Sequence, residues 1–593
     1  MRDLELPGRS PAHGMKAMAA TSHTLSTNAA IDILRAGGNA MDAAIAACAV
    51  QCVVEPGSTG IGGDNFCLYW TAGADAPVAF NGSGKAPTGA TCEYFAAEGI
   101  TELSRQHPHS CVVPGAADAW CRLNADHGKL PLKDVLAPAI DYAANGYPIS
   151  SRVSADWASA VDLMKAEPTM ARTFLVDGAS PKVGDVHRQP ELARTMQAVA
   201  DGGREAFYTG EIAKDMVDYL RGLGGLHTME DFANAQGDYV TPISADFRGH
   251  RVWQCPPNGQ GVIALLMLNI MSGVEAGATP ITTDRIHAEI EACRLAYTAR
   301  NVYLGDPAYA DVDVETLLSA GYADKLRALI NPARARDPMP DPDLVRHNDT
   351  VYISVVDADG NACSFINTLF EGWGAGLCSP NTGVVFTNRA QGFSLDTAKS
   401  PFPDPDLVRH RDTVYIAVVD GEGNACSFIN TLFDGWGAGL CAPKSGVVLT
   451  NRAQGFSLDP ASPNRIEPGK RPLHTIIPAM VTKGGKAVMP YGVMGGEYQA
   501  MGHMQFLTRM FDYGMDIQEA QDAPRFMADP FTGEIEIERT VPEAIRNELA
   551  AKGHNIVAPK KPIGGSQAIW IDPETGVLTG GSEPRKDGCA IGY

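Results

Sequence analysis

Two threonines stand where a chain could cut itself and use the new end in catalysis. Thr350 and Thr413 each follow an aspartate, and each opens a run of alternating apolar residues, TVYISVV in one case and TVYIAVV in the other. Cleavage before such a threonine frees an α-amine beside the hydroxyl of the same residue, and that amine can act as the base that activates the hydroxyl. The pattern therefore predicts an N-terminal threonine nucleophile; the alternative is an ordinary strand threonine.

The sequence around each threonine favours a linker followed by a hairpin. The segment DPMPDPDLVRH, shortly before Thr350, is rich in Pro and Asp and poor in large apolar residues, which is typical of an exposed linker. After each threonine the apolar period is two, and a DGN or EGN turn leads into ACSFIN. We therefore expect a β-hairpin that begins at the threonine.

The two threonines belong to two copies of one stretch. Residues 340–396 and 403–459 differ at nine of 57 positions and are offset by 63 residues. The differences are mild apart from Asn348/Arg411 and Asn381/Lys444. A tandem duplication explains this best, and two copies are too few for a solenoid. Only one copy can occupy one place in a sheet.

Composition and charge exclude several classes of function. The 593 residues suffice for several domains or one large one, and the net charge of −21 disfavours nucleic acid and anionic membranes as partners. The longest apolar run, 43–54, contains Gln51, is too short to span a bilayer and is typical of a buried helix. The first residues lack the pattern of a secretory signal, so we expect a cytoplasmic protein.

No pattern predicts a metal or a cofactor. The 13 cysteines form no CxxC pair, so we expect small core residues and neither a metal site nor a disulfide framework. The run NGSGKAP at 81–87 departs from a phosphate loop at Ala79 and Ala86, which favours a structural turn. His287-x-Glu289 lacks the HExxH spacing, so we expect His287 to face solvent or cap the core.

The expected elements suggest a layered fold. Residues 28–34 and 39–54 predict two helices, 66–70 a strand, and residues 113 to about 331 a mainly helical part that includes a strand at 249–255. The end of the chain is rich in strands, among them GVVLTN and HTIIPAMV, and the stretch GVMGGEYQAMGHMQFLTRMF predicts a glycine turn that runs into a helix. Helices, then strands, then helix and strand suggest an αββα sandwich.

Nearly the whole chain resembles the γ-glutamyltransferase family of N-terminal nucleophile (Ntn) hydrolases. The matching pieces, in the order of the family, are GGNAMDAAIAA, VVEPGSTGIGGDNF, VPGAADAW, LPLKDVLAPAI, CPPNGQG, DTVYIAVVDGEGNACSFINTL, PGKRPLHTIIPAM and GVMGGEYQAMGH. Within the family the chain most resembles the cytoplasmic, oxamate amidohydrolase-like branch with NGSG and DTVY signatures. The resemblance implies an α+β Ntn-hydrolase αββα sandwich with a mainly helical large-chain part and a strand-rich small-chain part.

The resemblance also implies how the chain matures and acts. An inactive precursor cuts itself before the threonine by an N-to-O acyl shift, and the resulting large and small chains stay together. The implied catalytic residues are the nucleophile, the threonine that orients it and two glycines whose backbone N–H groups form the oxyanion hole: Thr413 or Thr350, Thr431 or Thr368, and Gly495 with Gly496. A bare turn is the alternative for the glycine pair.

Departures from the family pattern bear on the substrate. Most members hold the glutamyl α-carboxylate with an arginine just before an AP dipeptide and with a Ser-Ser pair, where this chain has FNGSGKAP and His474-Thr475. They hold the α-amino group with an N-Q-x-D-D-F-S run, where this chain has Arg452 and Gly455 in NRAQGFS. A cation there repels a substrate ammonium and favours a carboxylate or carbonyl. The expected substrate-binding residues are Arg452, its copy-one counterpart Arg389, His474, Thr475 and Asn451.

We therefore expect a self-processing amidohydrolase that acts on a small acidic amide through an acyl-enzyme. It would need no cofactor and no metal, and a homo-oligomer is left open. The alternatives are a γ-glutamyltransferase or glutathione hydrolase, and a non-catalytic member whose maturation the duplication blocks. For Arg452 the alternative is a surface strand residue that pairs with an acidic neighbour.

The continuation of the sequence favours the second copy as the working one. Copy two runs into PNRIEPGKRPLHT, which resembles the family, whereas copy one is followed by DTAKSPFP. We therefore expect a large chain, 1–412, that includes a spare copy at 340–402, and a small catalytic chain, 413–593, with 349/350 as the alternative boundary. The spare strands are a liability for edge pairing.

Overall fold

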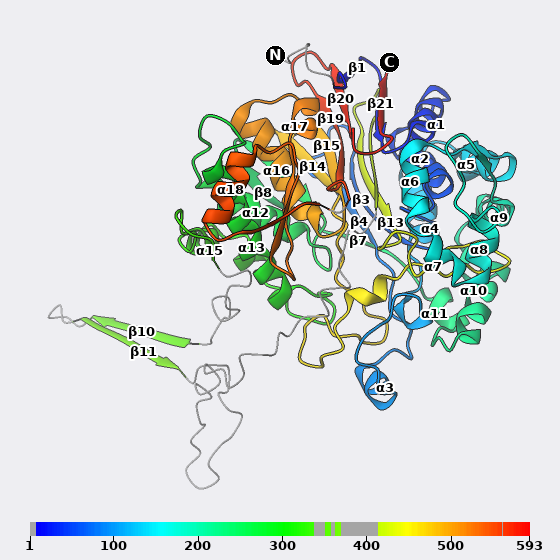
Figure 1. Cartoon of the computed structure of the whole chain (residues 1–593), viewed down its shortest axis with the longest axis horizontal. Coiled ribbons are helices and arrows are strands. Elements are labelled where there is room, and N and C mark those ends of the chain that lie inside the picture. Colours follow the sequence, from blue (N-terminus) through cyan, green and yellow to red (C-terminus); the bar gives the residue numbers. More distant parts are fainter. Residues whose placement is uncertain (1–7, 337–349, 357–361, 369–412, 560) are drawn as a thin grey trace, which may run out of the picture.

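The computed structural model describes residues 8–336, 350–356, 362–368, 413–559 and 561–593. Two seven-stranded sheets stack face to face, and helices cover the outer face of each (Figure 1). This is the αββα sandwich that the sequence predicts. Among the described helices, none combines the length and the apolar character that crossing a membrane requires.

The first sheet holds the hairpin of copy two at its centre. Every neighbouring pair of its strands is antiparallel, and its strands come from the start, the middle and the end of the chain. Its order is β21 (Cys589–Gly592), β2 (Met18–Thr21), β12 (Val414–Val419), β13 (Ala425–Thr431), β3 (Asp64–Trp70), β4 (Val78–Gly82) and β7 (Asp238–Val240). The hairpin lies between strands from the start of the chain.

The second sheet is also antiparallel throughout. Its order is β1 (Ala12–Gly14), β20 (Leu578–Ser582), β19 (Gly565–Ile571), β15 (Lys486–Met494), β14 (Ala479–Lys483), β9 (His250–Gln254) and β8 (Ile243–Phe247). The predicted strand at 249–255 is confirmed as β9. The predicted strand at 446–451 is wrong, because this stretch forms only an isolated bridge between Cys441 and Val448.

The two sheets meet through β12 and β15. Tyr415 and Ile429 point into an apolar layer between the sheets, and the Tyr415 ring packs against Gly492, where an added Cβ would lie 2.2 Å from the ring. The Tyr415 hydroxyl hydrogen-bonds Ser427 Oγ at 2.7 Å, and Ser427 Oγ accepts from the Ala479 backbone N–H at 3.0 Å. A side chain at position 492 would push the sheets apart.

Helices on the outer face of the first sheet surround α2 (Ala40–Val54), which packs on β12 and β13 and is buried along its whole length. Asn39 caps it: its side chain accepts from the Met41 and Asp42 backbone N–H groups, and its own backbone N–H donates to the Asp42 carboxylate. The preceding helix starts four residues earlier than predicted because the His23 side chain caps it. The larger helices here are α1 (Thr24–Arg35), α4 (Ala116–His127), α5 (Leu132–Asn145) and α9 (Pro190–Tyr208).

Helices on the outer face of the second sheet form a second apolar core. They are α12 (Gly261–Ser272), α13 (Thr283–Tyr303) and α16 (Tyr498–Tyr513); α12 contacts β8 and β9, and α16 contacts β15. The helix predicted after the GVMGG turn is confirmed as α16. Both helical layers therefore rest on sheets that carry site residues.

Further elements lie outside the two large sheets and the helices named above. The helices are α3 (Cys92–Ala97), η1 (Pro108–Ser110), α6 (Ser151–Ala158), α7 (Val161–Lys165), α8 (Pro168–Phe174), α10 (Glu211–Gly222), α11 (Met229–Ala233), α14 (Val314–Leu317), α15 (Ala320–Arg327), η5 (Arg452–Gly455), α17 (Ile517–Asp522) and α18 (Glu543–Ala551). The strands are β5 (Tyr147–Pro148), β6 (Val186–His187), β16 (Phe526–Ala528), β17 (Glu534–Ile537) and β18 (Asn555–Val557).

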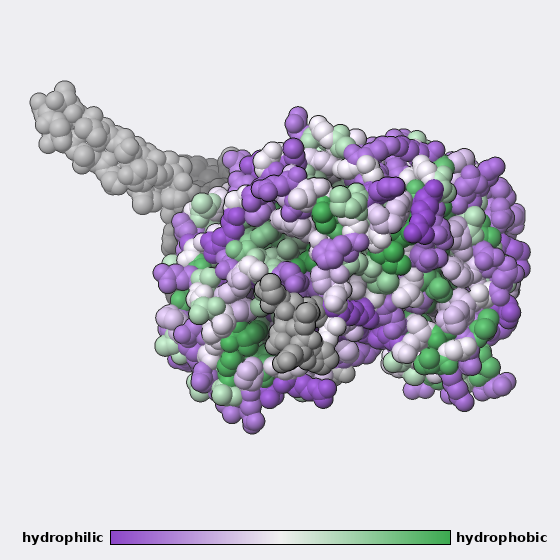
Figure 2. All heavy atoms as spheres, turned by 90° about the horizontal axis from the view of Figure 1, so that it is seen from above, coloured by the Kyte–Doolittle hydropathy of each residue, from purple (hydrophilic) through white to green (hydrophobic). Residues whose placement is uncertain are grey.

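Figure 2 shows one face, where hydrophilic residues dominate and apolar ones are interspersed.

The two copies of the repeat pair differently. In copy one, β10 (Thr350–Val356) and β11 (Ala362–Thr368) form a two-stranded antiparallel sheet that bonds to no other described strand (Figure 1). In copy two, the same hairpin occupies the centre of the first sheet. The predicted hairpin is confirmed in both copies, although β12 begins one residue after its threonine.

Candidate active site

Strand pairing brings the two predicted threonines of copy two together. Thr413 directly precedes β12 and Thr431 ends β13, and the register pairs Val414 with Asn430. The two Oγ1 atoms lie 3.3 Å apart, within hydrogen-bond distance, and both residues are buried. A hydroxyl at the end of one strand is thus held beside a hydroxyl at the start of its partner.

In copy one the backbone shows the same juxtaposition. Thr350 lies opposite Thr368 in the β10–β11 ladder. Their side chains are outside the described part of the structure, and so is Arg389. Among the described side chains, the structure therefore brings together the two threonines of copy two.

A strained loop follows Thr431 and holds its hydroxyl. The Phe433 backbone N–H donates to Thr431 Oγ1 at 2.9 Å, and Phe433 and Trp436 have φ angles of 84° and 69°, a region that bulky side chains rarely adopt. The loop is fixed at its base, where Asp434 N donates to Asn451 Oδ1 at 3.0 Å. Such strain persists only where the surroundings over-determine it, and it clusters at functional sites.

The predicted oxyanion glycines form a tight turn between β15 and α16. Gly495 and Gly496 have φ angles of 116° and 57°, and a Cβ on Gly495 would lie 2.8 Å from Gly564 Cα. The carbonyls of the pair accept from Tyr498 N and Gln499 N, at 3.1 Å each, so the turn enters the first turn of α16. The positive end of the helix dipole lies here, which suits a developing negative charge.

Arg452 lies inside the protein. It sits in the 3₁₀ turn Arg452–Gly455 with no exposed surface, and its guanidinium carbon is 3.8 Å from the centre of the Phe433 ring. Its Nε donates to Asp64 Oδ2 at 3.3 Å and its Nη1 to Thr475 Oγ1 at 3.4 Å. The alternative of a surface strand residue is therefore wrong, although the acidic neighbour is present.

Asp64 belongs to the candidate site, although no sequence pattern predicts it. Its Oδ1 accepts from Gly84 N at 2.7 Å, and its Oδ2 lies 3.2 Å from His474 Nε2 in addition to the contact with Arg452. Burial raises the pKa of this carboxyl, but the hydrogen bond from His474, the charge of Arg452 and the Gly84 N–H outweigh burial and leave the pKa below its ordinary value. The available signal was an acidic residue at the start of the apolar run NFCLYW.

His474 and Asn451 take different positions. His474 Nδ1 accepts from Ile476 N at 3.3 Å, so its Nε2 carries the proton and donates to Asp64. Asn451 Nδ2 donates to Asp434 Oδ2 and to Gln454 Oε1, at 2.6 Å each. His474 is thus a neutral imidazole beside the Asp64–Arg452 pair, whereas Asn451 holds the strained loop in place.

One polar network connects these parts. Asp64 lies opposite Thr431 in the β3–β13 ladder, and the guanidinium bound to Asp64 reaches Thr475. The side chain of Gln260 then donates to Thr475 O at 3.0 Å and to Gly496 O at 3.3 Å. The predicted nucleophile, the predicted substrate-binding residues and the oxyanion turn are consequently parts of one buried site.

Comparison with known proteins fits this arrangement. The family model described as Gamma-glutamyltranspeptidase matches residues 26–407 and 400–593. The chain belongs to the γ-glutamyltranspeptidase family. The first matched segment contains copy one of the repeat and the second contains copy two.

Relatives in the γ-glutamyltranspeptidase family align along almost their whole length. The "Glutathione hydrolase-like YwrD proenzyme" of Bacillus subtilis is 33% identical over 98% of this chain and 99% of its own. The "Oxamate amidohydrolase proenzyme" of Klebsiella pneumoniae is 30% identical, with 98% of both chains covered. The crystal structure of cephalosporin acylase from Bacillus halodurans has a TM-score of 0.83 and 36% identity, covering 100% of this chain and 99% of the other. The Ntn-hydrolase fold is thereby confirmed.

Outside the network, one buried cluster has the residue types of a metal site. His287, Glu291 and His554 offer ligand atoms within 4.8 Å of one another. Arg294 Nη1 lies 3.3 Å from His554 Nδ1, so the other nitrogen of that ring donates to His287 Nδ1 at 2.7 Å, and His287 Nε2 donates to Asn331 O at 2.8 Å. These hydrogen bonds satisfy both rings, and the Arg294 cation opposes a metal ion. His287 is buried, so the expectation of a solvent-facing residue is wrong and that of a core residue holds.

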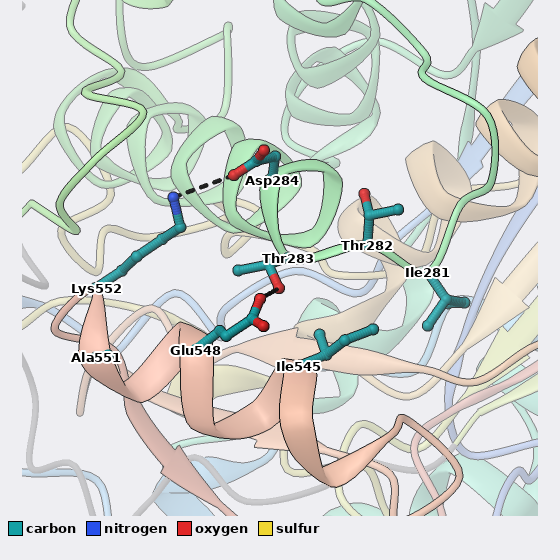
Figure 3. Close-up of a pocket in the computed structure, with 8 residues that line it drawn as sticks. All are labelled: Ile281, Thr282, Thr283, Asp284, Ile545, Glu548, Ala551 and Lys552. Carbon is teal, nitrogen blue, oxygen red and sulfur yellow. Dashed lines mark hydrogen bonds and ion pairs between the residues drawn. The ribbon is translucent and has the colours of Figure 1, made fainter.

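The glycine-rich turn and a surface pocket lie apart from this chemistry. In the run 81–87, a Cβ on Gly84 would lie 2.4 Å from Val113 O, so the run is a packed turn, as expected. A pocket of about 630 Å³ lies between the start of α13 and α18, lined by none of the predicted site residues (Figure 3). There Lys552 pairs with Asp284 at 3.1 Å.

Proposed function

We propose that the chain is a self-processing amidohydrolase with Thr413 as its N-terminal nucleophile. The observation that carries this proposal is the pair Thr413 and Thr431, whose hydroxyls lie 3.3 Å apart at the centre of a sheet. Relatives described as proenzymes support self-processing. The proposed chains are 1–412 and 413–593, with 340–402 as a spare copy.

Maturation would begin at the bond between Asp412 and Thr413. The Thr413 hydroxyl attacks the Asp412 carbonyl carbon, and the Thr413 nitrogen leaves as an amine, which gives an ester. Water then hydrolyses the ester, restoring the hydroxyl and leaving a carboxylate on Asp412. The two chains would stay together because β2 and β3 of the large chain flank β12 and β13 of the small chain.

Catalysis would use the same hydroxyl. The freed amine of Thr413 takes the hydroxyl proton, and Oγ1 attacks the substrate carbonyl while the Thr431 hydroxyl orients it. The N–H groups of Gly495 and Gly496 stabilise the oxyanion, and such donors are typically worth about 10² to 10³ in rate each. Ammonia leaves with the proton, and water hydrolyses the acyl ester to release the acid and restore Thr413.

For the substrate we propose a small acidic amide. The carboxylate of Asp64 already accepts hydrogen bonds from Gly84, Arg452 and His474, so an incoming ammonium group would compete for it with a guanidinium. The Arg452 cation repels an ammonium and attracts a carboxylate. The relative described as oxamate amidohydrolase supports this class of substrate.

Two substrates test the proposal. Purified, self-cleaved enzyme should release ammonia from oxamate, and Arg452→Gln should raise KM for oxamate by about tenfold or more, as the loss of a charged hydrogen bond does. The substrate proposal fails if the enzyme instead releases p-nitroaniline from a γ-glutamyl anilide, releases no ammonia from oxamate-like amides, and tolerates Arg452→Gln.

The relative described as glutathione hydrolase-like supports a second candidate function, the hydrolysis of γ-glutamyl compounds. The same pair of substrates separates the two functions. We keep the cytoplasm as the proposed compartment, because the described cysteines are free and suit a reducing environment. Cell fractionation tests the compartment.

A further inference from the structure

The buried side chain of Gln260 joins two parts of the site, the segment before β14 and the turn after β15. Gln260 donates through Nε2 to Thr475 O at 3.0 Å and to Gly496 O at 3.3 Å. Its own backbone N–H donates to His474 O at 2.9 Å. The glutamine thus contacts both the segment that leads into β14 and the oxyanion turn that follows β15.

Gln260 is itself held rigidly. It precedes α12, whose residues are almost all buried, and its carbonyl accepts from Ile263 N at 3.0 Å. Its Oε1 accepts from Arg300 Nη1 at 3.1 Å, and the same guanidinium is paired with the Glu497 carboxylate. Tyr297 adds a hydrogen bond to Glu497 O. Glu497, the residue after the oxyanion turn, is therefore held by Arg300 at its carboxylate and by Tyr297 at its backbone carbonyl, and Arg300 holds Gln260 as well.

We propose that Gln260 is a positioning residue that sets the oxyanion turn against the substrate-binding segment. This inference rests on the proposed function, in which Gly495 and Gly496 stabilise the oxyanion. Gln260 lies in the proposed large chain and its two acceptors in the small chain, so it places the turn across the boundary that self-cleavage creates.

The expected effect falls on the chemical step. In Gln260→Met the side chain keeps its length and loses both donors, so the turn is no longer held at its present distance from Thr475. A displacement of 1 Å in a catalytic group can cost about 10²-fold in rate. We expect kcat to fall about 10- to 100-fold, and KM to change by less than about threefold because ground-state binding does not use the oxyanion donors.

Gln254→Met is the matched control. Gln254 is equally buried and lies six residues earlier, but its side chain contacts His503 Nδ1 at 3.3 Å and neither part of the site. Both variants lose a buried amide, but Gln260→Met also loses the bonds to two carbonyls and to Arg300, so its melting temperature should fall further, and kcat is compared on folded enzyme. Only Gln260→Met should lose kcat, measured on the p-nitroanilide of oxalic acid and normalised to the amount of chain that begins at Thr413.

Gln260→Glu gives an independent signature. At neutral pH its carboxylate would face two carbonyl oxygens, so kcat should fall further than in Gln260→Met. Protonation restores one donor, so the ratio of variant to wild-type kcat should rise as the pH falls. If Gln260 merely supported packing, the ratio of variant to wild-type kcat would not change with pH.

Three outcomes would overturn the inference while leaving the proposed function intact: wild-type kcat in Gln260→Met, an equal loss in Gln254→Met, or maturation lost in both Gln260 variants while the control matures. A wild-type chain that stays uncut or hydrolyses no amide would instead refute the proposed function.

Discussion

Buried charges lie beside Thr431, and in the proposed site they would determine how a substrate is held. Arg452 has no exposed surface, and a buried cation without a partner is strongly destabilising, so Asp64 must balance it. Asp64 and Arg452 are 388 residues apart in the chain. No local pattern reports such a contact, which is why the sequence identified the arginine and not the aspartate.

The second hydroxyl of the pair can be tested by isosteric substitution. Thr431→Val removes the hydrogen-bonding hydroxyl beside Thr413 and keeps the shape of the side chain. We expect kcat to fall about tenfold, since a hydrogen bond is worth about 0.5–1.5 kcal/mol. Steady-state kinetics on self-cleaved enzyme measure this. Thr431→Ser keeps the hydroxyl and should retain most of the activity; equal losses in the two variants would contradict an orienting role.

The lowered pKa of Asp64 predicts how its contribution to stability depends on pH. A depressed folded pKa means that the stabilisation is present above the unfolded value of about 3.9 and is lost as the pH falls through the folded value. Urea unfolding should show Asp64→Asn to be less stable than wild type by about 3–5 kcal/mol at neutral pH. The gap should shrink below about pH 4.

The control for that measurement is an exposed ion pair. Asp246 pairs with Arg251 on the surface, so Asp246→Asn should leave the free energy of unfolding unchanged at every pH. A gap between wild type and Asp64→Asn that stayed constant or widened as the pH fell would show that Asp64 is not the ionised partner of Arg452.

At the scale of elements, the sequence predicts those helices and strands whose formation depends on contacts between neighbouring residues. The capping box at Asn39 fixes the start of α2 from neighbouring residues alone, and the predicted helix at 39–54 agrees with α2 to within one residue. The stretch 446–451 has strand-like composition but forms no strand. Its Leu449, Thr450 and Asn451 N–H groups bond to carbonyls of separate segments, Leu440, Gly62 and Leu432, so no continuous ladder forms.

The contact between the sheets predicts an intolerant glycine. Gly492→Ala would place a methyl group 2.2 Å from the Tyr415 ring in a packed layer, so we expect a destabilisation of about 1–3 kcal/mol or more and a lower melting temperature. Gly222→Ala in α10 is the control, since nothing lies within 4 Å of its added Cβ and alanine favours a helix. A Gly492→Ala protein as stable as Gly222→Ala would contradict the packing of β12 on β15.

At the scale of the whole molecule, the order of motifs predicted the sandwich and the family, and the structure and the comparisons confirm both. The sequence favours copy two of the repeat through the residues that follow it. In the structure, β12 has β2 and β13 as neighbours, whereas β10 pairs with β11 alone among the described strands. β2 comes from the start of the chain, so no local pattern predicts this difference in pairing between the two copies.

The most direct test of the account is the first residue of the small chain. Purified protein should separate on a denaturing gel into two chains, and N-terminal sequencing of the smaller should read TVYIAVVD, which begins at Thr413. Thr413→Ala should leave the chain uncut, whereas Thr350→Ala should mature as wild type does. A small chain that reads TVYISVVD from Thr350, or a wild-type chain that remains whole, would contradict the account.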